Sequence, residues 1–128
     1  MTTELLNLTC VTALTAVMWI PYVLNAIQVR GLTNAVSYPA EQAPLAPWAD
    51  RLKAAHYNAV ENLVVFAALV LIANAAGISN EQTIMATTVY FWARLVHPIA
   101  YAFAIPWVRT LAFAVGFVCQ ATLALQLL

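Results

Sequence analysis

The stretch AAHYNAVENLVVFAALVLIANAAG, residues 54–77, decides how this chain folds. Its second half is apolar enough to lie inside a lipid bilayer. Its first half carries a histidine, two amides and a carboxylate, at His56, Asn58, Glu61 and Asn62. A charged side chain inside a bilayer costs about 2.5–3.5 kcal/mol on insertion scales, so such residues normally face the interior of a helix bundle. The stretch predicts a membrane helix that carries a polar face near one end.

The composition is that of a membrane protein. Of the 128 residues, 64% are hydrophobic and only 8% are charged, whereas a soluble domain of this size needs more polar surface. The net charge is zero, which gives no indication of a nucleic-acid partner. The start, Met-Thr-Thr-Glu, lacks the basic region of a secretory signal peptide, so we expect the first apolar run to stay in the protein. We find no metal-ligand spacing, phosphate loop or serine nucleophile motif.

Charge-free segments and helix breakers predict four membrane spans. Residues 5–29 contain no charged side chain, and about 20 residues suffice for a helix to cross the hydrocarbon. By the same reasoning we expect membrane helices over residues 5–29, 50–76, 82–105 and 107–128, with a loop over 32–50. Pro21 should bend the first helix. Because the connections are short, the predicted fold is all-α: one domain, residues 1–128, forming an antiparallel four-transmembrane-helix bundle.

The few basic residues predict the orientation in the membrane. Four of the five, namely Arg30, Arg51, Lys53 and Arg109, lie in or beside the first and third connections. The termini and the second connection carry no Lys or Arg. The positive-inside rule therefore predicts an integral multi-pass protein whose first and third connections are cytoplasmic and whose termini are outside.

Polar side chains of different helices should meet at one depth. Glu61 lies about 10 Å, and Arg94 about 16 Å, from the cytoplasmic end of its helix. We expect these two charges to lie near each other or to share a polar ligand. Helical spacing also places Asn58 with Glu61 on one stripe, and His97 and Tyr101 with Arg94 on another.

These stripes have two interpretations. Polar residues often serve only to form hydrogen bonds between membrane helices, each of which stabilises the bundle by about 0.6 kcal/mol. However, arginine, glutamate, histidine, asparagine and tyrosine at one level favour a site for an amphipathic, anionic ligand. Arginines bind carboxylates in bidentate fashion, and a glutamate suits an ammonium group, so a zwitterionic, peptide-like molecule fits the set.

The polar motifs resemble a known family. The second-helix run RLKAAHYNAVEN, residues 51–62, is similar to the signature of the MAPEG family, the membrane-associated proteins in eicosanoid and glutathione metabolism. The third-helix run RLVHPIAY, residues 94–101, resembles the family's R-x-x-H-x-x-x-Y stripe. Arg109 occupies the place of the family arginine just after the third connection. Length and the four-span layout agree over essentially the whole chain, which looks like a bacterial-type member.

The resemblance implies a homotrimer that binds glutathione, as co-substrate, between neighbouring subunits at the cytoplasmic half of a bacterial inner membrane. It implies a glutathione-dependent transferase or peroxidase that acts on apolar electrophiles or lipid hydroperoxides. Arg109 would be the catalytic residue that stabilises the glutathione thiolate. The residues implied to hold glutathione or support its site are Arg30, Arg51, His56, Asn58, Glu61, Arg94, His97 and Tyr101. No metal is implied.

Two positions depart from the family pattern. Ala54 stands where many relatives carry another arginine, and Phe113 stands where some place a tyrosine. Thr110, next to Arg109, could offer a hydroxyl to the sulfur. The alternative function is a non-catalytic membrane oligomer or lipid-binding module that uses the same polar residues for assembly. A small proton-coupled transporter using Glu61 is a third reading, which pairing with Arg94 would disfavour.

Overall fold

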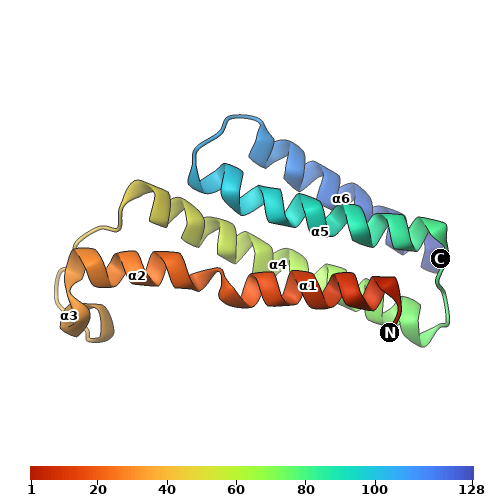
Figure 1. The fold of residues 1–128 in the computed structure, drawn as a ribbon, viewed down its shortest axis with the longest axis horizontal. Coiled ribbons are helices and arrows are strands. Elements are labelled where there is room, and N and C mark those ends of the chain that lie inside the picture. Colours follow the sequence, from red (N-terminus) through yellow and green to blue (C-terminus); the bar gives the residue numbers. More distant parts are fainter.

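A computed structural model describes residues 1–128, and it is helical throughout apart from the connections. The helices are α1 (Thr3–Val17), α2 (Trp19–Arg30), α3 (Leu32–Val36), α4 (Pro47–Ala75), α5 (Glu81–Ala102) and α6 (Val108–Leu127). The consecutive α1 and α2 form one rod, which lies antiparallel to α4, and α5 lies antiparallel to α6 (Figure 1). The protein is therefore all-α, as predicted.

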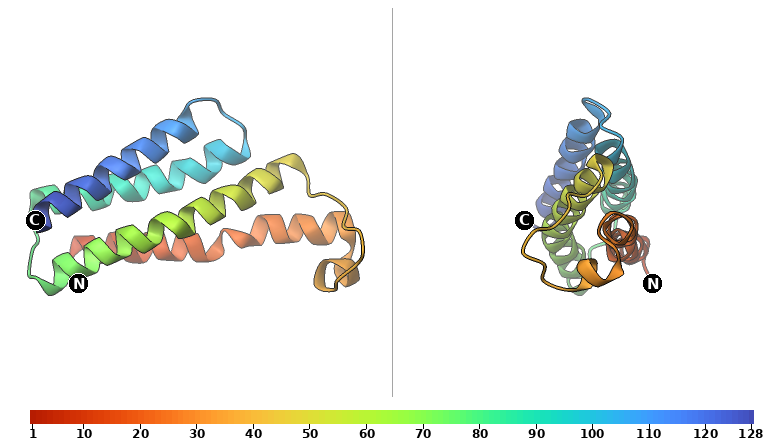
Figure 2. Two further views of the ribbon diagram at one scale, coloured as in Figure 1. Left: turned by 180° about the vertical axis from the view of Figure 1, so that it is seen from behind. Right: turned by 90° about the vertical axis from the view of Figure 1, so that its left-hand side faces the viewer.

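The two ends of the bundle differ in what they carry. The connection from α2 to α4 and the connection from α5 to α6 lie at one end, which we call the arginine end because Arg30, Arg51 and Arg109 flank these connections (Figure 2). Both termini and the α4–α5 connection lie at the opposite end, which we call the terminal end. The α5–α6 pair is the shorter one, so α2 and α3 extend beyond it at the arginine end (Figure 1).

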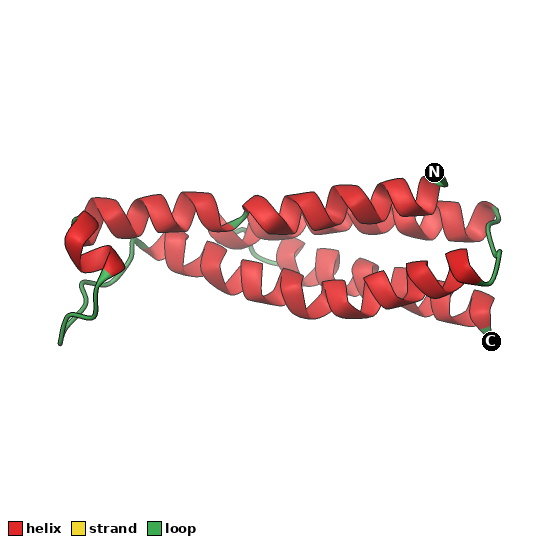
Figure 3. Ribbon diagram, turned by 90° about the horizontal axis from the view of Figure 1, so that it is seen from below, coloured by secondary structure: helices red, strands yellow, loops and turns green.

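The first rod is broken rather than continuous. Met18 forms a turn between α1 and α2, and Figure 3 shows the short loop there. Pro21 is the third residue of α2 and lacks the N–H that would bond to the carbonyl of Val17, and its ring would clash with that carbonyl. The helix therefore stops at Val17 and restarts, so the distortion lies one turn before the proline.

The first connection is shorter and more ordered than the expected loop over 32–50. It contains the five-residue helix α3, which follows Gly31 at φ +79°, a conformation that favours glycine. Helix α4 begins at Pro47, three residues before the predicted start at Asp50. Proline is well suited to the first helical position because that residue needs no hydrogen-bonded N–H.

Three rods are long and apolar enough to cross a membrane: residues Thr3–Arg30, Pro47–Ala75 and Val108–Leu127. The protein is thus an integral multi-pass membrane protein. Helix α5 has 22 residues but is not among these candidate spans. Its buried side chains include Thr83, Thr87, Arg94 and His97, so it buries more polar side chains than any other helix. The sequence-based count of four spans is therefore supported for three, and the fourth stays a prediction.

The main core joins α1, α4, α5 and α6 in the half of the bundle nearer the terminal end. Phe66 of α4 stacks on Tyr90 of α5 with ring centroids 3.8 Å apart. Gly116 of α6 faces the same Tyr90 ring, because a Cβ built on it would lie 3.6 Å from the ring edge. The core residues are Leu8, Val11, Phe66, Val70, Ala86, Tyr90, Cys119 and Leu123. This packing fixes the register of α4 against α5, and so the positions of the polar residues at the arginine end.

Candidate functional site

A buried arginine links α4 to α5. Arg94 is 3% exposed, and its Nη2 donates to Asn58 Oδ1 at 2.9 Å. Asn62 supports this asparagine from the next turn by donating to its backbone carbonyl at 2.8 Å. A neutral amide oxygen satisfies one donor of the guanidinium but leaves its positive charge uncompensated. Arg94 is therefore held in place and can attract an anion.

Glu61 does not compensate that charge. Its side chain is exposed on the outer face of α4, and no ion pair joins it to Arg94. The two residues thus form no ion pair within one chain, although Asn58, the partner of Arg94, lies one turn from Glu61 on α4. A polar ligand that both residues share stays a prediction. The carboxylate nevertheless stands on a membrane-spanning helix, where a charge needs a partner.

A polar cavity of about 210 Å³ lies where α5 turns into α6. Two guanidinium groups line it, those of Arg51 and Arg109, together with Tyr101 and the Thr110 side chain. Arg51 Nε donates to the Ala102 carbonyl at 3.0 Å, which ties the start of α4 to the end of α5. No acidic residue lines the cavity, so its charge is positive and would favour an anionic group.

Arg109 lies over the face of Tyr101, with its Cζ 4.5 Å from the ring centroid. This distance is in the range of a cation–π contact, which holds the guanidinium without neutralising it. The connection that presents Arg109 contains two residues at positive φ, Ala104 at +55° and Trp107 at +70°. Residues other than glycine rarely adopt this conformation, and such strain clusters at functional sites.

His97 continues the stripe from Arg94 to Tyr101. Its ring meets Tyr101 edge-on, with centroids 5.8 Å apart at 70°. The side chain is 2% exposed, and its Nδ1 has no hydrogen-bond partner in the chain. Helical spacing predicted this stripe, and the structure places Arg94, His97 and Tyr101 along one side of α5, with Arg109 of α6 against its last member.

His56 is held by a residue that the sequence alone did not single out. Tyr22 Oη lies 2.7 Å from His56 Nδ1 and joins α2 to α4. One turn further along α2, Asn25 Oδ1 accepts from the Ala46 N–H at 2.9 Å. The feature of the sequence that could have identified Tyr22 is its spacing from Asn25, because residues three apart lie on one face of a helix.

Arg30 lies apart from this cavity. Its Nε donates to the Ala43 carbonyl at 2.7 Å within the first connection. It lines a separate cavity of about 200 Å³ together with Asn34 and Glu41. The structure therefore brings Arg51, Tyr101 and Arg109 into one cavity and Asn58, Arg94 and His97 beside it, but leaves Arg30 and Glu61 outside.

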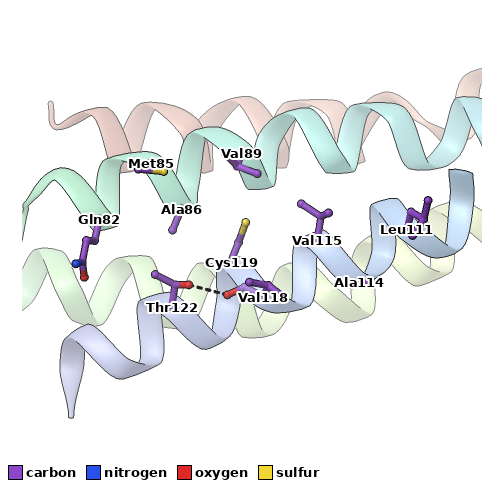
Figure 4. A pocket seen from close by; sticks show the side chains of 10 residues that line it. All are labelled: Gln82, Met85, Ala86, Val89, Leu111, Ala114, Val115, Val118, Cys119 and Thr122. Carbon is purple, nitrogen blue, oxygen red and sulfur yellow. Dashed lines mark hydrogen bonds between the residues drawn. The ribbon is translucent and has the colours of Figure 1, made fainter.

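An apolar groove runs along α5 and α6 toward the polar cavity. Its wider part, about 420 Å³, is lined mostly by hydrophobic side chains that include Met85, Val89 and Val118 (Figure 4). Leu111 lines both this part and a second apolar hollow of about 340 Å³, which extends to Val108 beside Arg109. An apolar molecule in the groove would therefore reach the arginine end.

No group of three or more His, Cys, Asp or Glu side chains comes together in the chain as metal ligands would. The chemistry of the site thus rests on arginine, tyrosine, histidine and amide groups. Such a set binds carboxylates and stabilises a developing anion.

The chain is similar to known proteins. The MAPEG family model matches residues 8–128. Microsomal glutathione S-transferase 1 of Mus musculus is 34% identical over 80 residues, which make up 62% of this chain and 52% of that protein. The chain thus spans about half the length of this curated relative. No solved structure matches the present chain. Because the family model matches nearly the whole chain, including all the residues of the polar cavity, the chain belongs to the MAPEG family.

Proposed function

We propose that this protein is a glutathione-dependent transferase or peroxidase that acts on apolar electrophiles or lipid hydroperoxides. The observation that carries the proposal is the polar cavity at the α5–α6 turn, where Arg51 and Arg109 converge without any carboxylate. Family membership and the similarity to a glutathione S-transferase support the same thiol co-substrate.

The charges of the site fit glutathione, which carries two carboxylates, one ammonium group and one thiol. Arg51 would take a carboxylate, and the buried Arg94 would attract a second one while Asn58 holds it. Glu61 would accept the ammonium group from its exposed position on α4. His56 and His97 would support the site through Tyr22 and Tyr101. Arg30, in its own cavity, would steer the anionic thiol toward the site.

Arg109 would stabilise the thiolate form of glutathione. The thiolate is the reactive form, and a free thiol has a pKa of about 8.5. A guanidinium beside the sulfur favours the anion by direct charge interaction. The thiolate would form a bond to an electrophilic carbon while the leaving group departs with its electron pair. With a hydroperoxide, it would attack the outer oxygen and break the O–O bond, so that the alkoxide leaves and takes a proton from water to become the alcohol. A second glutathione would then reduce the resulting sulfenic acid, which gives glutathione disulfide and water.

The site would be completed by a second copy of the chain in a homotrimer. Ligand pockets usually measure about 300–1,000 Å³. The polar cavity, at about 210 Å³, is smaller than that range and needs further walls to enclose a tripeptide. Glu61, exposed on a membrane-spanning helix, would gain its partner at the same contact.

The apolar co-substrate would enter from the membrane. The groove between α5 and α6 presents a hydrophobic surface that leads to Val108 and hence to Arg109. We propose further that α5 crosses the membrane beside α6, with its polar residues turned into the bundle. The arginine end would then face the cytoplasm of a bacterial cell and admit the water-soluble thiol, in accordance with the positive-inside rule.

Ultraviolet difference absorbance of the detergent-purified protein on adding glutathione tests the proposal. The wild type should show a thiolate band, and Arg109→Leu should lose it while still binding glutathione in an equilibrium assay. Lys53→Met is the matched control, because this lysine lies at the same end but approaches only the Tyr57 ring, at 5.9 Å. No binding of glutathione to the wild type would refute the proposal.

A second function is favoured by one observation: Arg94 already has a neutral partner in Asn58, as a purely structural arginine would. The protein would then be a non-catalytic oligomer or lipid-binding module. In that case Glu61→Gln and Arg94→Met would abolish the oligomer, and no thiol would bind. A trimer that persists in these variants while thiol binding is lost would rule this function out.

A further inference from the structure

The terminal end holds a second polar cluster, which the proposed reaction does not use. Glu4, in the first turn of α1, is 4% exposed. Its Oε1 accepts hydrogen bonds from Thr83 Oγ1 at 2.6 Å and from Ser79 Oγ at 2.9 Å. Both partners come from the start of α5 and the turn before it, so the carboxylate joins the first rod to the α4–α5 connection.

The other carboxylate oxygen has no partner in the chain. Glu4 Oε2 is buried and makes no hydrogen bond. Glu4 lines a cavity of about 140 Å³, together with the polar side chains of Thr2, Asn74 and Ser79. A buried carboxylate oxygen without a donor is costly, since a carboxylate removed from water needs a hydrogen-bond donor or a cation.

No basic side chain lies near this oxygen, and the α-amino group of Met1, the one positively charged group at this end, makes no hydrogen bond to it. Four of the five basic side chains lie at the arginine end, and the fifth, Arg94, donates to Asn58 within the bundle. The nearest charged side chain in sequence on α5 is Glu81, which is itself acidic and exposed. In a symmetric membrane oligomer, the neighbouring subunits would carry their arginine ends on the same side, so they cannot compensate Glu4 either.

We propose that the cavity beside Glu4 is a binding site for a monovalent alkali-metal cation. Glu4 Oε2 would be the charged ligand, and the oxygens of Thr2, Ser79 and Asn74 would complete the shell together with water. A volume of about 140 Å³ has room for an ion that keeps part of its hydration, because one water occupies about 30 Å³. Calcium is disfavoured, since it normally takes six to eight oxygen ligands with several carboxylates.

The bound cation would fasten three elements together. Thr2 and Glu4 belong to the start of α1, Asn74 to the last turn of α4, and Ser79 to the connection before α5. A ligand that binds only the folded state raises its stability in proportion to the logarithm of concentration above the dissociation constant. The cation would therefore stabilise the terminal end independently of any thiol.

Thermal unfolding of the full chain in detergent tests this inference at constant pH and ionic strength. Replacing N-methyl-D-glucamine chloride by sodium or potassium chloride should raise the Tm saturably, by roughly 5 °C at saturation. Glu4→Gln should abolish this dependence, because a neutral amide offers its own N–H donors at the Oε2 position. Glu81→Gln, which removes an exposed carboxylate at the same end, should retain it.

Two further measurements keep the inference testable if Glu4→Gln does not fold. Ser79→Ala should raise the cation concentration needed for the half-maximal shift about tenfold, since it removes one ligand and one donor to Glu4. In the infrared spectrum of the wild type, exchange of the cation should shift an ionised carboxylate band. An equal Tm in all salts, or a protonated-carboxyl band in every salt, would overturn the inference.

Discussion

The two ends of this bundle carry opposite charges that are held in different ways. At the arginine end, Arg30 and Arg51 each donate to a neutral oxygen and Arg109 lies over an aromatic ring, and within α5 Arg94 also donates to a neutral oxygen. None of these guanidinium groups bonds a carboxylate. At the terminal end, a carboxylate is held by hydroxyl groups within a helix-capping network.

The two ends therefore have different roles. Neutral partners orient the guanidinium groups while leaving their positive charge available, as an anion-binding site requires. At the terminal end, Asn80 caps α5 through a reciprocal capping box with Thr83, and the same threonine bonds Glu4. Those contacts satisfy helix ends and join two rods, so they serve the fold. Substitutions at the two ends should therefore separate activity from stability.

The largest effect should come from Arg109→Leu. Because this guanidinium contacts only a ring face, its loss should leave the free energy of unfolding nearly unchanged. Removing one group that stabilises a developing anion typically lowers kcat about 10²–10³-fold. Glutathione conjugation kinetics with a model electrophile measure this fall, and Arg109→Lys should recover part of it by restoring the charge. A stability loss as large as the activity loss would mean that Arg109 serves the fold.

Asn58→Leu should lower both the stability of the protein and its affinity for the thiol. It leaves the buried Arg94 guanidinium without its hydrogen-bond acceptor, which should lower the free energy of unfolding by about 1–3 kcal/mol. Thiol affinity should fall as well, since Arg94 would lose its fixed orientation. Denaturant unfolding in detergent, together with equilibrium glutathione binding, measures the two effects.

The double variant Asn58→Leu, Arg94→Met provides the control for that prediction. Removing both partners replaces the polar pair by apolar side chains, which often restores stability. We expect the double variant to be more stable than Asn58→Leu alone but still defective in thiol binding. If the double variant bound glutathione normally, Arg94 would have no role in the site.

Helical spacing predicted correctly which residues share a face of α5. On α4 it was less successful, because Asn58 contacts Arg94 whereas Glu61, expected on the same stripe, is exposed. His97 and Tyr101 lie together on α5 as expected, and Arg94 reaches α4 through Asn58. Contacts that depend on the register between rods were not predictable from spacing. The bond between Tyr22 and His56 and the outward position of Glu61 belong to this class.

The start of α4 and the burial of Glu4 were also not predicted from the sequence. Helix α4 starts at Pro47, within the loop expected over residues 32–50, because proline suits a first helical position. No pattern in the sequence indicates that Glu4 is buried, yet it is among the most buried polar residues. Its burial depends on where the α4–α5 turn places Ser79 and Thr83, which requires the packed bundle.

The smallest effect should come from Thr83→Val at the terminal end. Valine keeps the shape of this fully buried side chain but removes its hydrogen bonds to Glu4 and to the Asn80 N–H. Ser79 still donates to Glu4, and the Asn80 side chain still caps α5, so the loss of stability should be about 1–2 kcal/mol. Thr9→Val is the matched control, because the Thr9 hydroxyl is exposed and bonds only its own helix. Conjugation kinetics at saturating glutathione should not change in either variant. A fall in activity with Thr83→Val, at a temperature where the variant is folded, would show that the two ends are coupled through α5.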